Sequence, residues 1–156
     1  TALKAAAFYA RWYPGLWPRS RAALFAAPGL PAGRGRHERF VRRAVPRLAR
    51  TVFHAMLRFG PALEKRQRVL GRLVDIGTDL FAMAAALSRA ESLLRRNPGE
   101  RSPAALANVF CEEARARVRR NFREMFRNDD RDEYRLAGNI LDGKAAWLEK
   151  GIAGNL

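Results

Sequence analysis

Three side chains in this sequence belong to residue types that bind zinc, namely His37, His54 and Cys111. A structural zinc site needs four ligands, which come from closely spaced Cys and His pairs. The two histidines fall in different predicted elements, and there is no second cysteine. We therefore expect no zinc site and interpret each histidine as a surface or partly buried polar group. The helical pattern around Cys111 predicts a half-buried, small apolar side chain.

Two carboxylates, Asp75 and Asp79, are one helical turn apart and would share a face of one helix. A di-metal carboxylate bundle would also require Glu-x-x-His pairs, and the sequence has none. Arg72 lies about one turn before Asp75, and the other predicted helices are rich in arginine. The pattern therefore indicates structural ion pairing, and a buried pair would fix the register of two helices.

Ser88 and the glycines around Arg34 are the remaining candidates for chemistry. A nucleophilic serine of the hydrolase type lies on a strand-to-helix turn between glycines, whereas Ser88 lies within a predicted helix. Gly33-Arg34-Gly35 follows no predicted strand, so it lacks the setting of a phosphate-binding loop. The sequence predicts no catalytic, cofactor-binding or metal-binding residue in this chain.

The distribution of charge indicates a binding role instead. The 156 residues include 30 Lys and Arg against 15 Asp and Glu, a net charge of +15. Residues 1–50 hold 11 of these cations and a single acid, Glu38. Such a field favours a polyanionic partner, either a phospholipid surface or a nucleic acid. Nucleic acid is the weaker alternative, because Val118 and Phe122 in the basic stretch 115–123 fall on a predicted core stripe.

The first 43 residues combine aromatic and basic side chains. Trp and Tyr favour the headgroup zone of a bilayer, and Arg is attracted to anionic lipid. We therefore predict membrane contact for seven residues of this segment: Phe8, Arg11, Trp12, Tyr13, Trp17, Arg19 and Arg21. The alternative is that these aromatic side chains pack on the rest of the protein.

The spacing of apolar residues predicts an all-α fold, because no stretch shows the alternation of a strand. We expect an antiparallel bundle of about four long helices in residues 44–156, preceded by a short aromatic and basic helical segment in residues 1–43. A loop is predicted over residues 28–36, and Gly60-Pro61 and Asn97-Pro98-Gly99 mark turns between helices.

Three predicted helices have an inward stripe. The helix over residues 62–96 has spacings of three and four, with Leu63, Leu70, Leu73, Gly77, Leu80, Ala84, Leu87 and Leu94. The next helix begins at Ser102 and places an apolar residue at every fourth position, with Leu106, Phe110, Ala114, Val118, Phe122 and Phe126. A last helix, capped by Asp129 or Asp130 and ending at Gly151, would face inward with Tyr134, Ala137, Ile140, Leu141 and Leu148.

Five short phrases, in order and in register, resemble the C-terminal extension of very-long-chain acyl-CoA dehydrogenases and their bacterial relatives. They are Arg72-Leu73-Val74-Asp75, Asp79-Leu80-Phe81-Ala82-Met83, Leu87-Ser88-Arg89-Ala90, Phe110-Cys111-Glu112-Glu113-Ala114 and Asn128-Asp129-Asp130. The resemblance covers residues 44–151. Its family-like structural positions are Arg72, Asp75, Asp79, Ser88 and Arg89.

The resemblance implies a helical bundle docked on the catalytic body of a homodimeric, FAD-dependent enzyme of fatty acid β-oxidation. In that family a glutamate removes the α-proton of the acyl-CoA while FAD accepts the β-hydride. The glutamate segment and the flavin-binding portions have no counterpart in this sequence, so FAD is expected in the parent enzyme and not in this chain. We therefore treat the chain, which starts at Thr1 without Met, as a fragment.

The resemblance also implies that a segment ahead of the bundle, here about residues 8–43, holds the enzyme on the inner membrane. The expected location is the cytoplasm, with peripheral association with that membrane. A stand-alone basic helical module, which binds nucleic acid or a partner helix, is the alternative from a different class of function.

Overall fold

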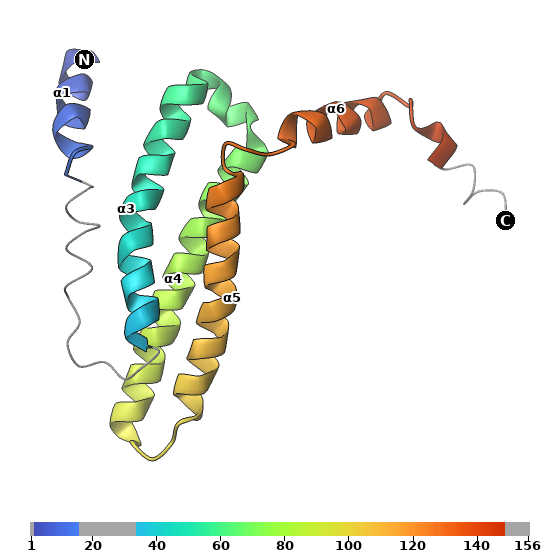
Figure 1. Ribbon diagram of the computed structural model, residues 1–156. Coiled ribbons are helices and arrows are strands. Elements are labelled where there is room, and N and C mark those ends of the chain that lie inside the picture. The colour runs from blue at the N-terminus through green and yellow to red at the C-terminus, as the bar shows by residue number, and fades with distance from the viewer. Residues whose placement is uncertain (1, 16–33, 149–156) are drawn as a thin grey trace. The chain divides into compact units, whose positions relative to one another are not determined.

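The structure, a computed structural model, describes residues 2–15 and 34–148. Every regular element in these residues is helical, which confirms the predicted all-α class (Figure 1). The long elements are α1 (Ala2–Trp12), α3 (Arg34–Phe59), α4 (Gln67–Arg96), α5 (Ser102–Glu124) and α6 (Asp130–Leu141). Two short 3₁₀ helices cover Gly60–Lys65 and Ala146–Leu148.

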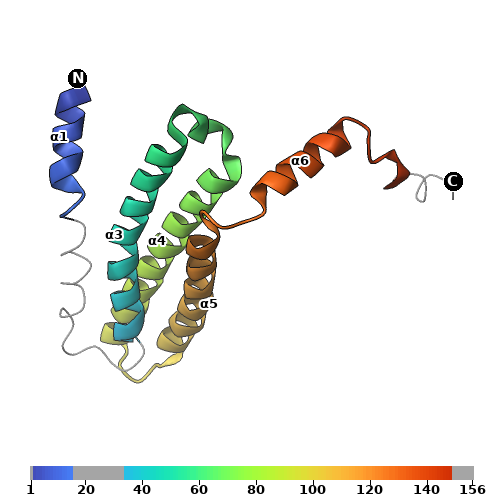
Figure 2. The same ribbon diagram turned by 45° about the horizontal axis from the view of Figure 1, so that its top comes forward.

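The chain divides into two compact units, residues 1–123 and residues 124–156. In the first unit α3, α4 and α5 lie side by side and alternate in direction, so α4 is antiparallel to both neighbours (Figures 1 and 2). The second unit contains α6. Three of the predicted long helices therefore form the bundle of the first unit, and the fourth belongs to a unit of its own.

The boundaries of α3 and α4 differ from the predicted ones. The loop predicted to reach residue 36 is already helical from Arg34, and α3 runs through residues 43 and 44 without a break. Gly60 forms the expected turn with a φ of +49°, a conformation that favours glycine. A 3₁₀ helix covers Gly60–Lys65, so α4 begins at Gln67 and not at residue 62.

The predicted inward stripe of α4 consists of two rows of residues. The row through Leu70, Gly77 and Ala84 was wrong. The buried residues are Val69, Ile76, Leu80, Met83 and Ala90, of which the prediction contained only Leu80. The predicted row through positions 70, 77 and 84 lies about 100° around the helix from the buried row through 69, 76 and 83. Val69, Ile76 and Met83 remove more apolar surface from water on burial than Gly77 and Ala84 of the predicted row would.

The stripe of α5 was correct in its middle and wrong at its ends. Ala114, Val118 and Phe122 are buried, but Leu106 and Phe126 are exposed. A step of four residues turns about 40° beyond a full helical turn, so a strict four-residue repeat drifts off the buried face. The buried residues instead mix steps of three and four, with Ala107, Cys111, Ala114, Val118 and Phe122.

The core of the bundle forms where α4 meets α5. Met83, Cys111 and Ala114 are fully buried and pack together, with Phe40 and Val41 of α3 against them. Cys111 was predicted to be half-buried and is fully buried. Loss of water around it raises the pKa of its thiol.

The predicted inward face of the last helix is exposed. Tyr134, Ala137, Ile140, Leu141 and Leu148 are all at the surface. The helix also ends at Leu141, before Gly143, whose φ of +75° ends the helical conformation. The predicted end at Gly151 lies outside the described residues.

Gly77 gives a test of the α3–α4 packing. A Cβ at Gly77 would lie 3.8 Å from Leu48 Cδ2, an ordinary contact with a side chain. We expect Gly77→Ala to raise the free energy of unfolding by about 0.5–1 kcal/mol, because alanine is the better helix former. Urea unfolding followed by circular dichroism measures the change.

Two glycine variants serve as controls for that measurement. Gly71 lies in the same helix, and a Cβ there would have no neighbouring atom within 4 Å. Gly71→Ala should therefore give a similar gain in the free energy of unfolding. Gly60→Ala should destabilise the protein by about 1–2 kcal/mol, because its φ is positive. A loss of stability in Gly77→Ala alone would show that α3 approaches α4 more closely than the structure indicates.

Candidate functional site: the groove between α3 and α4

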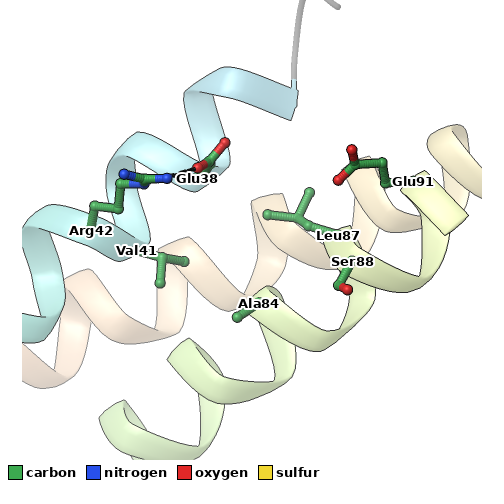
Figure 3. A pocket seen from close by; sticks show the side chains of 7 residues that line it. All are labelled: Glu38, Val41, Arg42, Ala84, Leu87, Ser88 and Glu91. Atoms are coloured by element: carbon green, nitrogen blue, oxygen red, sulfur yellow. Dashed lines mark hydrogen bonds and ion pairs between the residues drawn. The ribbon is translucent and has the colours of Figure 1, made fainter. Parts of the chain in front are cut away.

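A groove of about 340 Å³ lies between the first half of α3 and the second half of α4 (Figure 3). Its lining residues are Glu38, Val41, Arg42, Ala84, Leu87, Ser88 and Glu91. At the rim, Arg42 Nε donates a hydrogen bond to Glu38 Oε1 at 2.9 Å. The other rim carboxylate, Glu91, pairs with Arg95 at 2.5 Å on α4.

The lining suits binding better than catalysis. Ser88 is exposed, and neither histidine lines the groove beside it to act as a base. Both rim carboxylates already accept hydrogen bonds from arginine. Val41, Ala84 and Leu87 form an apolar floor, which can receive an apolar side chain from a partner.

Asp79 is part of an ion pair between α4 and α5, as the predicted structural role requires. Arg117 Nη2 donates to Asp79 Oδ1 at 2.7 Å, and Nε lies 3.2 Å from both carboxylate oxygens. The Asp79 side chain is only 13% exposed. Its hydrogen bond raises the pKa of Arg117.

The other family-like positions lie outside that pair. Asp75, Ser88 and Arg89 are exposed, and Arg72 is half-buried. Among these positions only Ser88 lines the groove. The structure therefore does not gather the five residues into one site.

A second polar group, the Glu112 cluster, joins the start of α3 to α5. It consists of Arg36, His37, Asn108, Glu112 and Arg115. Glu112 forms ion pairs with Arg36 and with Arg115, the latter at 3.3 Å. His37 Nε2 donates to Asn108 Oδ1 at 3.0 Å and lies 3.8 Å from Glu112 Oε1.

The interpretation of His37 as a surface or partly buried group was wrong, because the side chain is fully buried. Its hydrogen-bond partner, Asn108, lies 71 residues further along the chain, so the sequence pattern around His37 could not predict this contact. One signal could have identified it: His37 precedes Val41 and Ala44 on a row of α3 with steps of four and three. His54, in contrast, is exposed, as expected.

Arg115 is the buried cation of the Glu112 cluster. Its guanidinium lies over the ring of Phe40, with Cζ 5.3 Å from the ring centroid. Burial lowers the pKa of Arg115, and Glu112 opposes that effect. Arg115 Nε and His37 Nδ1 have no hydrogen-bond partner among the described residues. Glu112 is thus a counter-ion of this buried guanidinium.

The aromatic segment of α1 packs on α3. Tyr9 and Tyr13 lie with their ring centroids 5.2 Å and 5.1 Å from that of Phe53. The Tyr13 hydroxyl lies 2.7 Å from His54 Nε2, within hydrogen-bonding distance. Trp12 is half-buried beside the same phenylalanine. These contacts are the ones expected if the aromatic side chains pack on the rest of the protein, which was the alternative to membrane contact.

Two of the residues predicted to contact a membrane remain at the surface. Phe8 is 60% exposed, and Arg11 is exposed one turn later on α1. Trp17, Arg19 and Arg21 lie outside the described residues. None of the helices described here has the length and hydropathy that a bilayer crossing requires. The described residues also contain no cluster of three potential metal ligands.

Replacement of Glu112 tests the Glu112 cluster. Glu112→Gln leaves the buried Arg115 without its counter-ion, so we expect the free energy of unfolding to fall by about 1–3 kcal/mol. The double variant Glu112→Gln/Arg115→Met should recover most of that loss, because it removes the unpaired buried charge as well. Urea unfolding measures both effects. Equal stability of the single variant and the wild type would contradict this role.

Comparison with known proteins agrees with the architecture. Residues 36–143 match the family model described as ACAD9/ACADV, C-terminal domain. The chain is 41% identical over 155 residues to the probable acyl-CoA dehydrogenase FadE10 of Mycobacterium tuberculosis and to that of Mycobacterium bovis. The alignment covers 95% of this chain and 23% of each relative.

A more distant relative belongs to the same family. The mitochondrial very long-chain specific acyl-CoA dehydrogenase of Bos taurus is 30% identical over 109 residues, which cover 69% of this chain and 16% of that protein. No solved structure matches the chain. The chain thus spans about a quarter or less of the length of these curated relatives, and it belongs to the family of acyl-CoA dehydrogenase C-terminal domains.

Proposed function

We propose that this chain is the non-catalytic C-terminal domain of an FAD-dependent long- or very-long-chain acyl-CoA dehydrogenase of fatty acid β-oxidation. In this proposal the bundle docks on the catalytic body of a homodimeric parent enzyme and stabilises it. A domain of this kind needs a rigid core and an outer surface that fits the body. It needs no reactive group of its own.

The location of the family-like phrases is the observation that supports this role. Several of their members lie in the interior of the bundle or hold its helices together. Asp79 pairs with Arg117, while Met83, Cys111 and Ala114 form the core. Glu112 neutralises the buried Arg115. Part of the residues that carry the resemblance therefore stabilise a scaffold.

The groove between α3 and α4 does not fit a bound flavin. FAD contains a diphosphate with two negative charges, which requires amide N–H groups or cations around it. The groove instead places the carboxylates of Glu38 and Glu91 at its rim, and Arg42 is engaged by Glu38. We therefore assign FAD to the catalytic body of the parent, and derive no chemical step in this chain.

Separation of the domain from its parent tests the docking role. A protease site inserted ahead of residue 2 in the full-length protein would release this chain from the body. We expect the cut domain to co-elute with the body in gel filtration and to raise the temperature at which the body loses its flavin. A wild-type domain that elutes alone would contradict the proposal.

We also propose that the N-terminal segment brings the enzyme to an anionic membrane surface in the cytoplasm. The supporting observations are the exposure of Phe8 and Arg11 on α1 and the concentration of charge in residues 1–50. Trp12 and Tyr13 contribute indirectly, because they pack α1 on α3. Association at such a surface would place the active site near membrane-bound long-chain substrates.

Vesicle binding tests this contact. We expect the protein to bind vesicles with anionic lipid and to bind neutral vesicles weakly. The variant Phe8→Ala/Arg11→Gln should reduce partitioning roughly tenfold, since each cation contributes ~1 kcal/mol near an anionic leaflet. The control Leu106→Ala/Arg123→Gln removes the same kinds of side chain from α5. It should leave the partitioning into vesicles within about twofold of the wild-type value.

DNA binding over a salt series distinguishes the alternative function. A stand-alone nucleic-acid module should bind duplex DNA with an affinity that falls steeply with salt. Strong DNA binding without vesicle binding would support that module and contradict the membrane role.

A further inference from the structure

The α3–α4 face is an exposed apolar surface that the bundle leaves open. We define it by Val45, Val52 and Met56 of α3 and by Val74 and Phe81 of α4. Their exposed fractions are 52%, 36%, 46%, 65% and 75%. Soluble proteins rarely expose several large apolar side chains together without a partner for them.

The periodicity of the two helices places these residues on one side of the bundle. Val45, Val52 and Met56 are seven and four residues apart, and Val74 and Phe81 are seven apart, so each set follows one helical face. Leu48 meets Gly77 across the interface. Because α3 and α4 are antiparallel, Val52 is level with the turn that contains Val74, and Val45 with the turn that contains Phe81.

The α3–α4 face continues directly from the groove. Val41, one turn before Val45, lines the groove together with Ala84, which follows Phe81 by about one turn. The positions between the exposed residues are Ala49 on α3 and Gly77 and Thr78 on α4, none of which is charged. The face and the apolar floor of the groove thus form one apolar strip along both helices, with the charged Glu38, Arg42 and Glu91 at its edge.

The absence of charge on this strip contrasts with the rest of α3. The helix has eight arginines and one acid, and Arg36 and Arg47 of this set lie on the side that contacts α5. Arg42, beside the groove, is paired with Glu38. A polyanion would bind where cations gather, so a phospholipid surface or a nucleic acid does not fit the apolar strip.

We propose that the α3–α4 face is the surface by which this domain docks on the catalytic body of its parent dehydrogenase, with the groove receiving an apolar side chain of that body. This inference rests on the proposed function, because it requires the body. The curated mycobacterial relatives are about four times as long as the region that this chain matches. The remainder of such a protein is an occupant of sufficient size, and buried cores of interfaces are depleted in charge as this face is.

Phe81→Glu tests the assignment against a matched control, Leu106→Glu. Phe81 is 75% exposed on the α3–α4 face, and Leu106 is 72% exposed on α5. Neither substitution buries a charge within the domain, so circular dichroism should show the same helical content and melting temperature for both. In the cleaved full-length protein, we expect Phe81→Glu to weaken reassociation of domain and body roughly tenfold or more, and Leu106→Glu to leave it unchanged.

Each outcome of this experiment has one meaning. If the wild-type domain separates from the body, the proposed function fails and the inference fails with it. If the wild type and Phe81→Glu both remain bound, or if Leu106→Glu separates as readily, docking stands and the α3–α4 face is not its surface. If sedimentation shows that the released domain is a dimer that Phe81→Glu dissociates, the face binds a second copy and the inference is overturned.

Discussion

The bundle depends on the packing of one row of α4 against the helices on either side of it. Val69, Ile76, Met83 and Ala90 repeat every seven residues and are all buried. Met83 packs on Cys111 and Ala114 of α5, with Phe40 and Val41 of α3 beside them. The small side chains of α5 leave room for the long, flexible methionine, which fills irregular gaps well. Loss of this row would separate all three helices at once.

The strong positive charge of the chain is accommodated by pairing arginines with aromatic rings and a few acids. Arg47 lies over the ring of Phe122 at 4.1 Å, and Arg119 lies over Phe40 at 5.4 Å. Each contact places a guanidinium on apolar surface while its edge stays available to water. The acids Glu112 and Asp79 pair with the buried Arg115 and with the partly exposed Arg117. A basic chain can therefore build a compact bundle with half as many acids as bases.

The sequence was sufficient to predict the class of fold, the turn at Gly60 and the middle of the α5 core stripe, because these depend on local periodicity and backbone geometry. It was insufficient wherever a partner lies far along the chain. The burial of His37 requires Asn108, and the row of α4 that faces inward is chosen by its neighbours and not by its own composition. The groove depends on the register of α3 against α4. The residue types alone predicted no catalytic constellation, and they did not predict which surfaces remain exposed.

α3 illustrates how the exposed surface of such a domain can determine its function. Its inner row packs on α4, one flank bonds to α5 through the Glu112 cluster, and Phe53 and His54 hold α1. The flank with Val45, Val52 and Met56 stays exposed and carries no charge on these residues. Exposure of apolar side chains costs free energy in water, about 25 cal/mol for each Å². A helix that contacts α4, α5 and α1 and leaves this flank exposed is suited to a partner that removes the same surface from solvent.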